Sequence, residues 1–228
     1  MFPRTDRVTV RQSTQASKRR TRAEKREANR ERMLRAARKV FGARGYNGAT
    51  IEEIADEAGL SNGAIYYNFE SKGDLFLALL EERTDERIRH MRRTFATAVE
   101  AGPADTGLDE EARDATRSLK DSREWRLLLL EFTAHAVRTP SLAPKLQAHK
   151  RGFKTALAEL IQQRLSQRGA VSPIPIDQVA LAALALSNGL SIEELSDPGA
   201  VPDELLGHVL ALLLNQPGAE SLKGSRLG

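Results

Sequence analysis

Cysteine is absent from the 228 residues, so the chain can build neither a disulfide framework nor a zinc site based on thiolates. It also has no uninterrupted run of about 18 apolar residues, and the first ten residues, MFPRTDRVTV, lack the apolar core of a signal peptide. These absences predict a cytoplasmic protein that has no membrane partner.

Motifs typical of enzymes are missing as well: the sequence contains no HExxH segment, no P-loop and no GxGxxG turn. The four histidines, at positions 90, 135, 149 and 208, do not have the spacing of metal ligands. Glu131 and His135 share one face of a predicted helix, but an ordinary side-chain contact explains this pair better than a catalytic dyad. We therefore expect no catalytic residue, no metal site and no cofactor.

Acidic residues are scarce at the N-terminal end. Residues 1–49 contain 15 Lys or Arg and 4 Asp or Glu, which gives this segment a net charge of +11. Since the net charge of the whole chain is +4, the remaining residues carry a net charge of −7. Because neutralising phosphates releases counterions, this split predicts a polyanion partner for the N-terminal part. Residues 1–27 are expected to form a disordered basic arm, which either stays in solvent or reaches DNA through residues 18–26.

The most informative stretch, residues 50–69, reads TIEEIADEAGLSNGAIYYNF and predicts two short helices joined by a tight turn. Thr50 and Glu53 have the spacing of a capping box, so a helix is expected to begin at Thr50 and to end near Ala58. Gly59 can take a positive φ in the turn, and Ser61 can cap the second helix. These features predict a helix-turn-helix.

The second of these helices has one apolar side and one side left for a partner. Ile65 and Phe69, four residues apart, would anchor it to the first helix and leave two adjacent tyrosines facing outward. Lys72 then stands in the first turn of a third helix, where a cation suits the helix dipole poorly unless an anion such as a DNA phosphate lies nearby. A short helical hairpin without a DNA-binding role is the plain alternative.

Residues 41–81, FGARGYNGATIEEIADEAGLSNGAIYYNFESKGDLFLALLE, resemble the DNA-binding domain of the TetR family of bacterial transcriptional repressors. The resemblance implies a homodimer on a near-palindromic DNA operator, released by a small-molecule effector. It also implies phosphate contacts from Thr50, Tyr67 and Lys72, and a second helix that faces the major groove. The full set of implied DNA contacts is Thr50, Ser61, Asn62, Gly63, Ala64, Tyr66, Tyr67, Asn68 and Lys72.

No segment alternates with a period of two, so the fold class is predicted to be all-α. Residues 28–74 are expected to form a three-helix DNA-binding domain with the helix-turn-helix. A long helix over residues 71–99 joins it to a helical effector-binding and dimerisation domain, residues 75–216. Further helices are expected over residues 109–120, 123–137, 140–167, 177–195 and 201–215, before a C-terminal tail at 217–228.

The long helices carry side chains that suit a cavity for an apolar or amphipathic effector, although each of them also suits a plain core. The resemblance, rather than the spacing, is the reason to expect such a ligand. The candidate effector-binding residues are Met91, Phe95, Trp125, Phe132, His135 and Phe153.

The last two predicted helices carry almost no charge, so they must be buried on more than one side. Either they form the core of their own domain or, as the resemblance implies, they pair with their copies in a four-helix dimer interface. The candidate interface residues are Leu181, Leu184, Ala185, Leu205, Val209 and Leu213.

Three functions remain open at this point. The first is a homodimeric repressor released by an effector, and the second is a regulator of the same fold that activates transcription or has a vestigial pocket. The third is an all-α ligand carrier or enzyme with an incidental helix-turn-helix.

Overall fold

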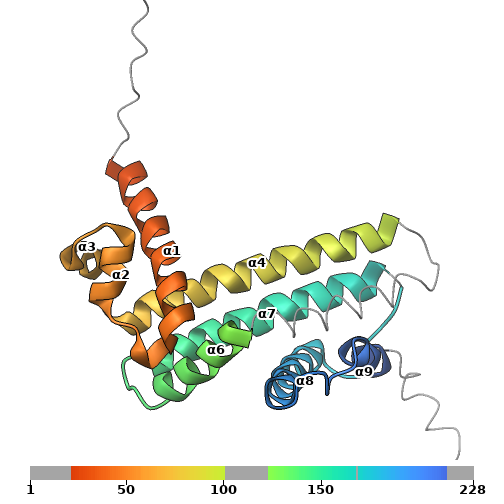
Figure 1. Cartoon of the computed structure of the whole chain (residues 1–228). Helices are drawn as coiled ribbons and strands as arrows, with labels where there is room; N and C mark the ends of the chain where they lie inside the picture. Colours follow the sequence, from red (N-terminus) through yellow and green to blue (C-terminus); the bar gives the residue numbers. More distant parts are fainter. Residues whose placement is uncertain (1–21, 101–122, 168, 215–228) are drawn as a thin grey trace, which may run out of the picture.

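The computed structural model describes residues 22–100, 123–167 and 169–214, and every element within these ranges is an α-helix (Figure 1). The all-α prediction is therefore confirmed. The predicted arm up to residue 21, the helix at 109–120 and the tail at 217–228 lie outside the described residues. The helices are α1 (Arg22–Gly48), α2 (Ile51–Ala58), α3 (Asn62–Asn68), α4 (Lys72–Glu100), α6 (Arg123–Ala136), α7 (Ala143–Gln167), α8 (Ile176–Ser196) and α9 (Leu205–Leu214).

Three helix starts differ from the prediction. Helix α1 begins at Arg22, so residues 22–27 of the predicted disordered arm are helical, which fits their run of Ala, Glu, Lys and Arg. Helix α7 begins at Ala143, because residues 139–142 form a turn in which the Leu142 N–H donates to the carbonyl of Thr139. Helix α9 begins at Leu205, because the Glu194 carboxylate accepts the N–H groups of Gly199 and Val201 and holds the preceding segment as a loop.

The main core joins the DNA-binding head, α1 to α3, to the helices that follow. Phe41 and Tyr46 of α1 pack against Phe76 of α4, with ring centroids 5.2 and 5.4 Å from the Phe76 ring. Phe132 of α6 completes the group at 4.4 Å from Phe76 and 5.2 Å from Tyr46. Since these rings lie in one buried cluster, the head is not an independent unit but shares its core with α4 and α6.

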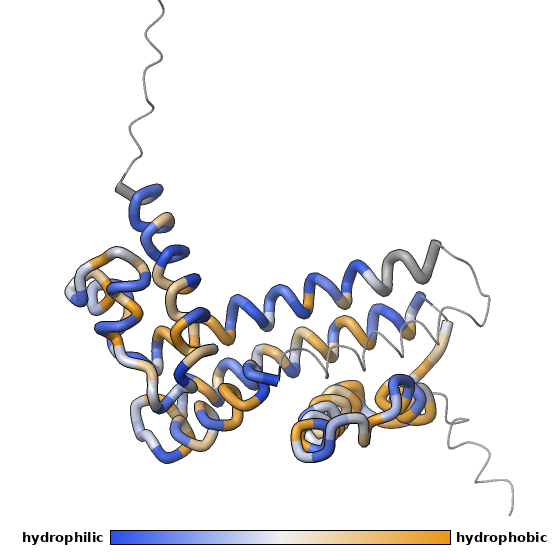
Figure 2. Tube along the Cα trace, viewed as in Figure 1, coloured by the Kyte–Doolittle hydropathy of each residue, from blue (hydrophilic) through white to orange (hydrophobic). Residues whose placement is uncertain are grey.

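Beyond this core, α4 and α7 run side by side away from the head, α8 lies against α7, and α9 lies beside α8 (Figure 1). A second, smaller core cluster holds Leu157 of α7 and Ala180 and Ala183 of α8. The tube in Figure 2 is apolar over much of α8 and α9 and polar at the start of α1. The long helix α4 thus begins in the head and ends in the second domain.

Helix α8 is incompletely covered in the single chain. By length and composition it is the one described helix that is apolar enough to cross a membrane, yet only 28% of its apolar window is buried. A core helix passes the same test, so one such helix is weak evidence of a membrane span. Its exposed side carries Leu181, Ala185 and Ile192, which share one face at helical spacing.

Candidate nucleic-acid interface

The two helices of the helix-turn-helix are set by local caps, as the sequence predicts. The Thr50 hydroxyl accepts the Glu53 N–H at 3.2 Å, and the Glu53 carboxylate accepts the Thr50 N–H at 3.2 Å, which completes a capping box. Gly59 ends α2 with φ 61°, and Ser61 caps α3 by accepting the Ala64 N–H at 3.2 Å. The guanidinium of Arg32 in α1 adds a 2.6 Å hydrogen bond to the Ala58 carbonyl, which fixes the turn to α1.

Helix α3 turns one side to the core and one to solvent. Ile65 and the following Phe69 are buried, whereas the side chains of Tyr66 and Tyr67 are 54% and 74% exposed. Asn62, Gly63 and Ser61 are also exposed, while Ala64 and Asn68 are half-buried. The amide nitrogen of Asn68 donates to the Ala64 carbonyl at 2.8 Å, so part of its hydrogen-bonding capacity is used within α3.

Positive charge lies beside α3 because of the helical start of α1. The Arg26 guanidinium is 5.5 Å from the centre of the Tyr67 ring, and that of Arg30 is 5.8 Å from the centre of the Phe69 ring. Lys25 and Arg26 are exposed, and the side chain of Arg22 is outside the described set. Of the basic residues predicted to reach DNA, Arg26 therefore lies next to the exposed ring of Tyr67.

Two of the four carboxylates of α2 are paired with cations of α1. Lys39 pairs with Glu57 at 2.8 Å, and Arg44 pairs with Glu53 at 3.4 Å. These pairs are exposed and contribute little to stability. Their consequence is electrostatic, since they offset carboxylates that would otherwise repel a polyanion near α3.

Lys72 has partners inside the head. Its ammonium donates to the carbonyls of Tyr46 at 2.8 Å and Ala49 at 2.9 Å, and it lies 4.8 Å from the centre of the Tyr46 ring. Partial burial lowers the pKa of Lys72 from its ordinary value. Lys72 therefore has acceptors for its ammonium without DNA, and its predicted contact with a DNA phosphate stays a prediction.

Glu131 is a functional candidate that the sequence analysis treated as an ordinary contact. From α6 its carboxylate accepts the Tyr46 N–H at 2.8 Å and the Asn47 N–H at 3.4 Å. It closes over Gly45, where φ is 73° and a Cβ would lie 3.0 Å from the carboxylate. We call residues 45–49 the 45–49 turn. The Glu131 carboxylate accepts hydrogen bonds from N–H groups of this turn, and the Lys72 ammonium donates hydrogen bonds to its carbonyls.

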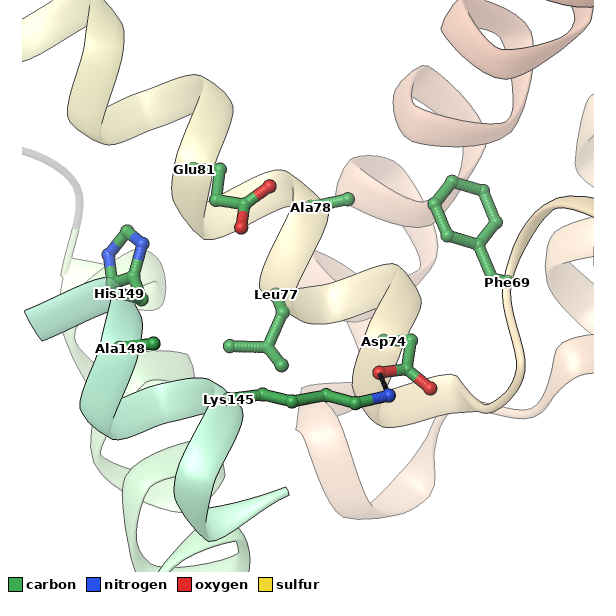
Figure 3. A pocket seen from close by; sticks show the side chains of 8 residues that line it. All are labelled: Phe69, Asp74, Leu77, Ala78, Glu81, Lys145, Ala148 and His149. Carbon is green, nitrogen blue, oxygen red and sulfur yellow. Dashed lines mark hydrogen bonds and ion pairs between the residues drawn. The ribbon is translucent and has the colours of Figure 1, made fainter. Parts of the chain in front are cut away.

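Two pockets lie near the head. The larger, of about 460 Å³, opens between α4 and α7 and is shown in Figure 3, where Lys145 reaches across to Asp74 at 2.7 Å. His149 lines it, with Nε2 3.3 Å from the Thr84 hydroxyl, and burial lowers the pKa of His149 although Glu81 and Asp85 oppose the shift. The smaller pocket, of about 130 Å³, is lined by Arg38, Gly42, Leu79, Arg83, Glu124, Trp125 and Leu128.

The structure does not bring the five predicted effector residues whose side chains it describes together in one cavity. Phe132 is fully buried in the main core, and Trp125 stacks on Phe76 at 5.7 Å while lining the smaller pocket. His135 is exposed and lies 5.1 Å from the Tyr46 ring. Met91 packs on the second core cluster and Phe153 lies under the Arg87 guanidinium at 5.8 Å. The side chain of Phe95 is outside the described set.

The predicted interface residues of α8 and α9 differ in how far they are exposed in the single chain. Leu181 is 57% exposed and Ala185 is exposed, so both remain open to a partner. Leu184 is half-buried and packs on the second core cluster of its own chain. In α9, Leu205, Val209 and Leu213 are all half-buried.

Comparisons with known proteins agree with this geometry. Residues 33–79 match the model for bacterial regulatory proteins of the tetR family, and residues 114–216 match the C-terminal domain of BetI-type transcriptional repressors. The chain is 30% identical over 148 residues to the transcriptional repressor AcnR of Corynebacterium diphtheriae, covering 65% of this chain and 71% of AcnR. It is also 30% identical over 138 residues to the transcriptional activator FasR of Mycolicibacterium smegmatis, covering 60% and 61%.

A solved structure of similar shape supports the fold. It is a TetR-family regulator from Mesorhizobium loti, with a TM-score of 0.65, 22% identity and coverage of 86% of this chain and 96% of that one. At 22% sequence identity, this structural similarity supports the fold and carries no conclusion about function. Together with the two family matches and the identity to AcnR, the helix-turn-helix geometry places the chain in the TetR family of helix-turn-helix, DNA-binding transcriptional regulators.

Proposed function

We propose that this regulator is a homodimeric repressor that binds a near-palindromic operator and leaves it when a small-molecule effector binds the helical domain. The observation that best supports DNA binding is that the exposed side of α3 lies next to the basic start of α1. Base edges are read there by a helix, and the cationic side chains supply the salt-dependent attraction to phosphates.

The reading surface has polar and small side chains but no arginine. Asn62 is exposed at the start of α3, so it suits bidentate hydrogen bonding to adenine, and Ala64 suits contact with a thymine methyl group. Asn68 suits this role less, because its amide nitrogen already donates to the Ala64 carbonyl. Tyr66 and Gly63 complete this surface, and phosphate contacts beside it would come from Thr50, Tyr67 and Lys72.

The dimer part of the proposal rests on α8. Its side with Leu181, Ala185 and Ile192 is largely apolar, with Asn188 among them, and is exposed in the single chain; a second copy of the same side would cover it about a two-fold axis. The two reading helices of such a dimer would enter successive major grooves about 34–36 Å apart, or a multiple of this.

Release by an effector requires a mechanical link between the two domains. The 45–49 turn supplies one, because Glu131 of α6 and Lys72 of α4 hold it from opposite sides. A displacement of either helix would alter the orientation of α2 and α3, which follow the turn. The coupling needed is modest, since about 3 kcal/mol of preference for the released state lowers operator affinity roughly a hundredfold.

A gel-shift with the DNA that flanks the protein's own gene tests the proposal. We expect a complex that weakens steeply with salt, and an Asn62→Ala variant that loses preference for operator over unrelated DNA by roughly 10-fold or more. Arg151→Ala, an exposed residue of α7, is the matched control and should bind as the wild type does. Equal affinity of the wild type for operator and unrelated DNA would contradict the assignment of α3 as the reading helix.

A further inference from the structure

The start of α4 is held from α7 by an ion-pair bridge, part of which is shown in Figure 3. The ammonium of Lys145, in the first turn of α7, lies 2.7 Å from one carboxylate oxygen of Asp74 and 2.9 Å from a carboxylate oxygen of Glu70. Both carboxylates belong to residues 69–74, which join the reading helix α3 to α4 and which we call the α3–α4 corner. The bridge therefore ties α7 to the segment that directly follows the reading helix.

The α3–α4 corner is short and has caps at both ends. At the end of α3, the Phe69 N–H donates to the Ile65 carbonyl at 2.9 Å. At the start of α4, the Ser71 hydroxyl accepts the Asp74 N–H at 3.1 Å and donates to that carboxylate at 2.8 Å. Because only residues 69–71 separate the two helices, a displacement of the start of α4 would be passed on to α3.

The corner also packs closely on the turn before α7. A Cβ at Gly73 would collide with the buried side chain of Leu142. Lys72 of the same corner donates to carbonyls of the 45–49 turn, whose N–H groups bind Glu131 of α6. Helices α6 and α7 thus contact the joint between the head and α4 at two places, α6 at the 45–49 turn and α7 at the α3–α4 corner.

The bridge is open to solvent, so it can break while the core stays folded. The side chain of Lys145 is 43% exposed and that of Glu70 is exposed, and pairs of this kind contribute little to stability. Hydrogen bonds to Asp74 and Glu70 raise the pKa of Lys145 to about 12, so its ammonium stays charged at any pH that suits operator binding. The bridge is therefore better suited to setting an orientation than to stabilising the fold.

We propose that Lys145 is a positioning residue for operator binding, because its bridge to the α3–α4 corner holds the reading helix α3 in the orientation that fits DNA. This inference rests on the proposed function, since a repressor released by an effector is in its DNA-binding form without one. A movement of α7 away from α4 would separate Lys145 from both carboxylates, allow the corner to shift and lower operator affinity. Helix α7 would then have its own route to the reading helix, beside that of α6 through the 45–49 turn.

Operator binding by Lys145→Gln tests this role, with Lys150→Gln as the matched control. Both changes remove one positive charge from an exposed lysine of α7, so the general attraction to DNA should fall to a similar extent. Lys145→Gln should bind operator about 3- to 30-fold more weakly than Lys150→Gln and should bind unrelated DNA as that control does. Lys145→Arg can still bridge two carboxylates, so it should restore operator binding nearly to the wild-type level.

A double-mutant cycle with Glu70→Gln separates the bridge from the effect of charge. In the Lys145→Gln background, Glu70 is a carboxylate without the ammonium beside it, so Glu70→Gln should strengthen operator binding by removing repulsion of the phosphates. In the wild type the same change also weakens the bridge, so the gain should be smaller or reversed. The effects of Glu70→Gln in the two backgrounds should therefore differ by about 2-fold or more.

Two measurements on the free protein need no DNA. Hydrogen exchange of the Phe69 and Leu75 amides, which donate at the end of α3 and in the first turn of α4, should be faster in Lys145→Gln than in Lys150→Gln. Urea should unfold these two variants at nearly the same concentration, because the bridge is exposed.

Five results would overturn the role of Lys145. Three concern operator binding: equal affinity of Lys145→Gln and Lys150→Gln, no recovery in Lys145→Arg, and equal effects of Glu70→Gln in both backgrounds. The other two are unchanged exchange at the corner and a marked loss of stability in Lys145→Gln, which would make this lysine structural. A wild type that bound operator and unrelated DNA alike would instead overturn the proposed function, and the exchange rates would still decide whether Lys145 holds the corner.

Discussion

Replacing Lys72 by alanine separates a structural role from a DNA contact. In the structure its ammonium donates to the carbonyls of Tyr46 and Ala49, at 2.8 and 2.9 Å, and these belong to the turn that joins α1 to α2. A hydrogen bond from a charged donor contributes about 1.5–3 kcal/mol when buried. Because the ammonium is only partly buried, the lower end applies to each bond, and Lys72→Ala should lower the free energy of unfolding by about 2–3 kcal/mol.

Lys39→Ala is the matched control, since Lys39 is also in the head and also has a short contact. Its partner is the Glu57 carboxylate at 2.8 Å, and the side chain of Lys39 is 71% exposed. Exposed pairs of this kind contribute about 0–1 kcal/mol. Urea denaturation of the two variants should therefore differ by about 2 kcal/mol, with Lys72→Ala the less stable.

The same variants report on DNA. If the Lys72 ammonium also reaches a phosphate, Lys72→Ala should lower the salt slope of operator binding by about 0.9, measured below the unfolding transition. An unchanged salt slope would mean that Lys72 contacts the 45–49 turn and no DNA phosphate. Equal stability of Lys72→Ala and Lys39→Ala would refute the reasoning from the two carbonyl contacts.

Two further predictions concern pH and assembly. Burial lowers the pKa of His149 below its ordinary 6.5, so the unfolded chain takes up a proton that the folded chain does not. Stability to urea should fall as the pH drops below 6.5, and His149→Gln should flatten that dependence; an unchanged slope would remove His149 as its cause. Leu181→Asp changes a side chain that is 57% exposed in the single chain, so sedimentation should show a folded monomer, and a folded dimer would exclude this side of α8 as the interface.

Sequence alone was sufficient for features whose partners are close in the chain. The caps at Thr50, Gly59 and Ser61 were predicted because each satisfies backbone groups only three or four residues away. The exposure of Tyr66 and Tyr67 followed from the burial of Ile65 and Phe69 by helical periodicity. The start of α1 was missed because its first turns have helix-forming residues but no apolar stripe to reveal them.

Tertiary structure decided the features whose partners are distant in the chain. Lys72 meets carbonyls 23 and 26 residues away, and Glu131 meets N–H groups 84 and 85 residues away, so neither partner has a local signal. Phe132 was expected to line a ligand cavity but fills the main core, because apolar faces that line a cavity and those that fill a core have the same periodicity. Which side of α8 is left open depends on how α7 covers it, because residues 179–187 of α8 are apolar nearly all round and only packing can distinguish their sides.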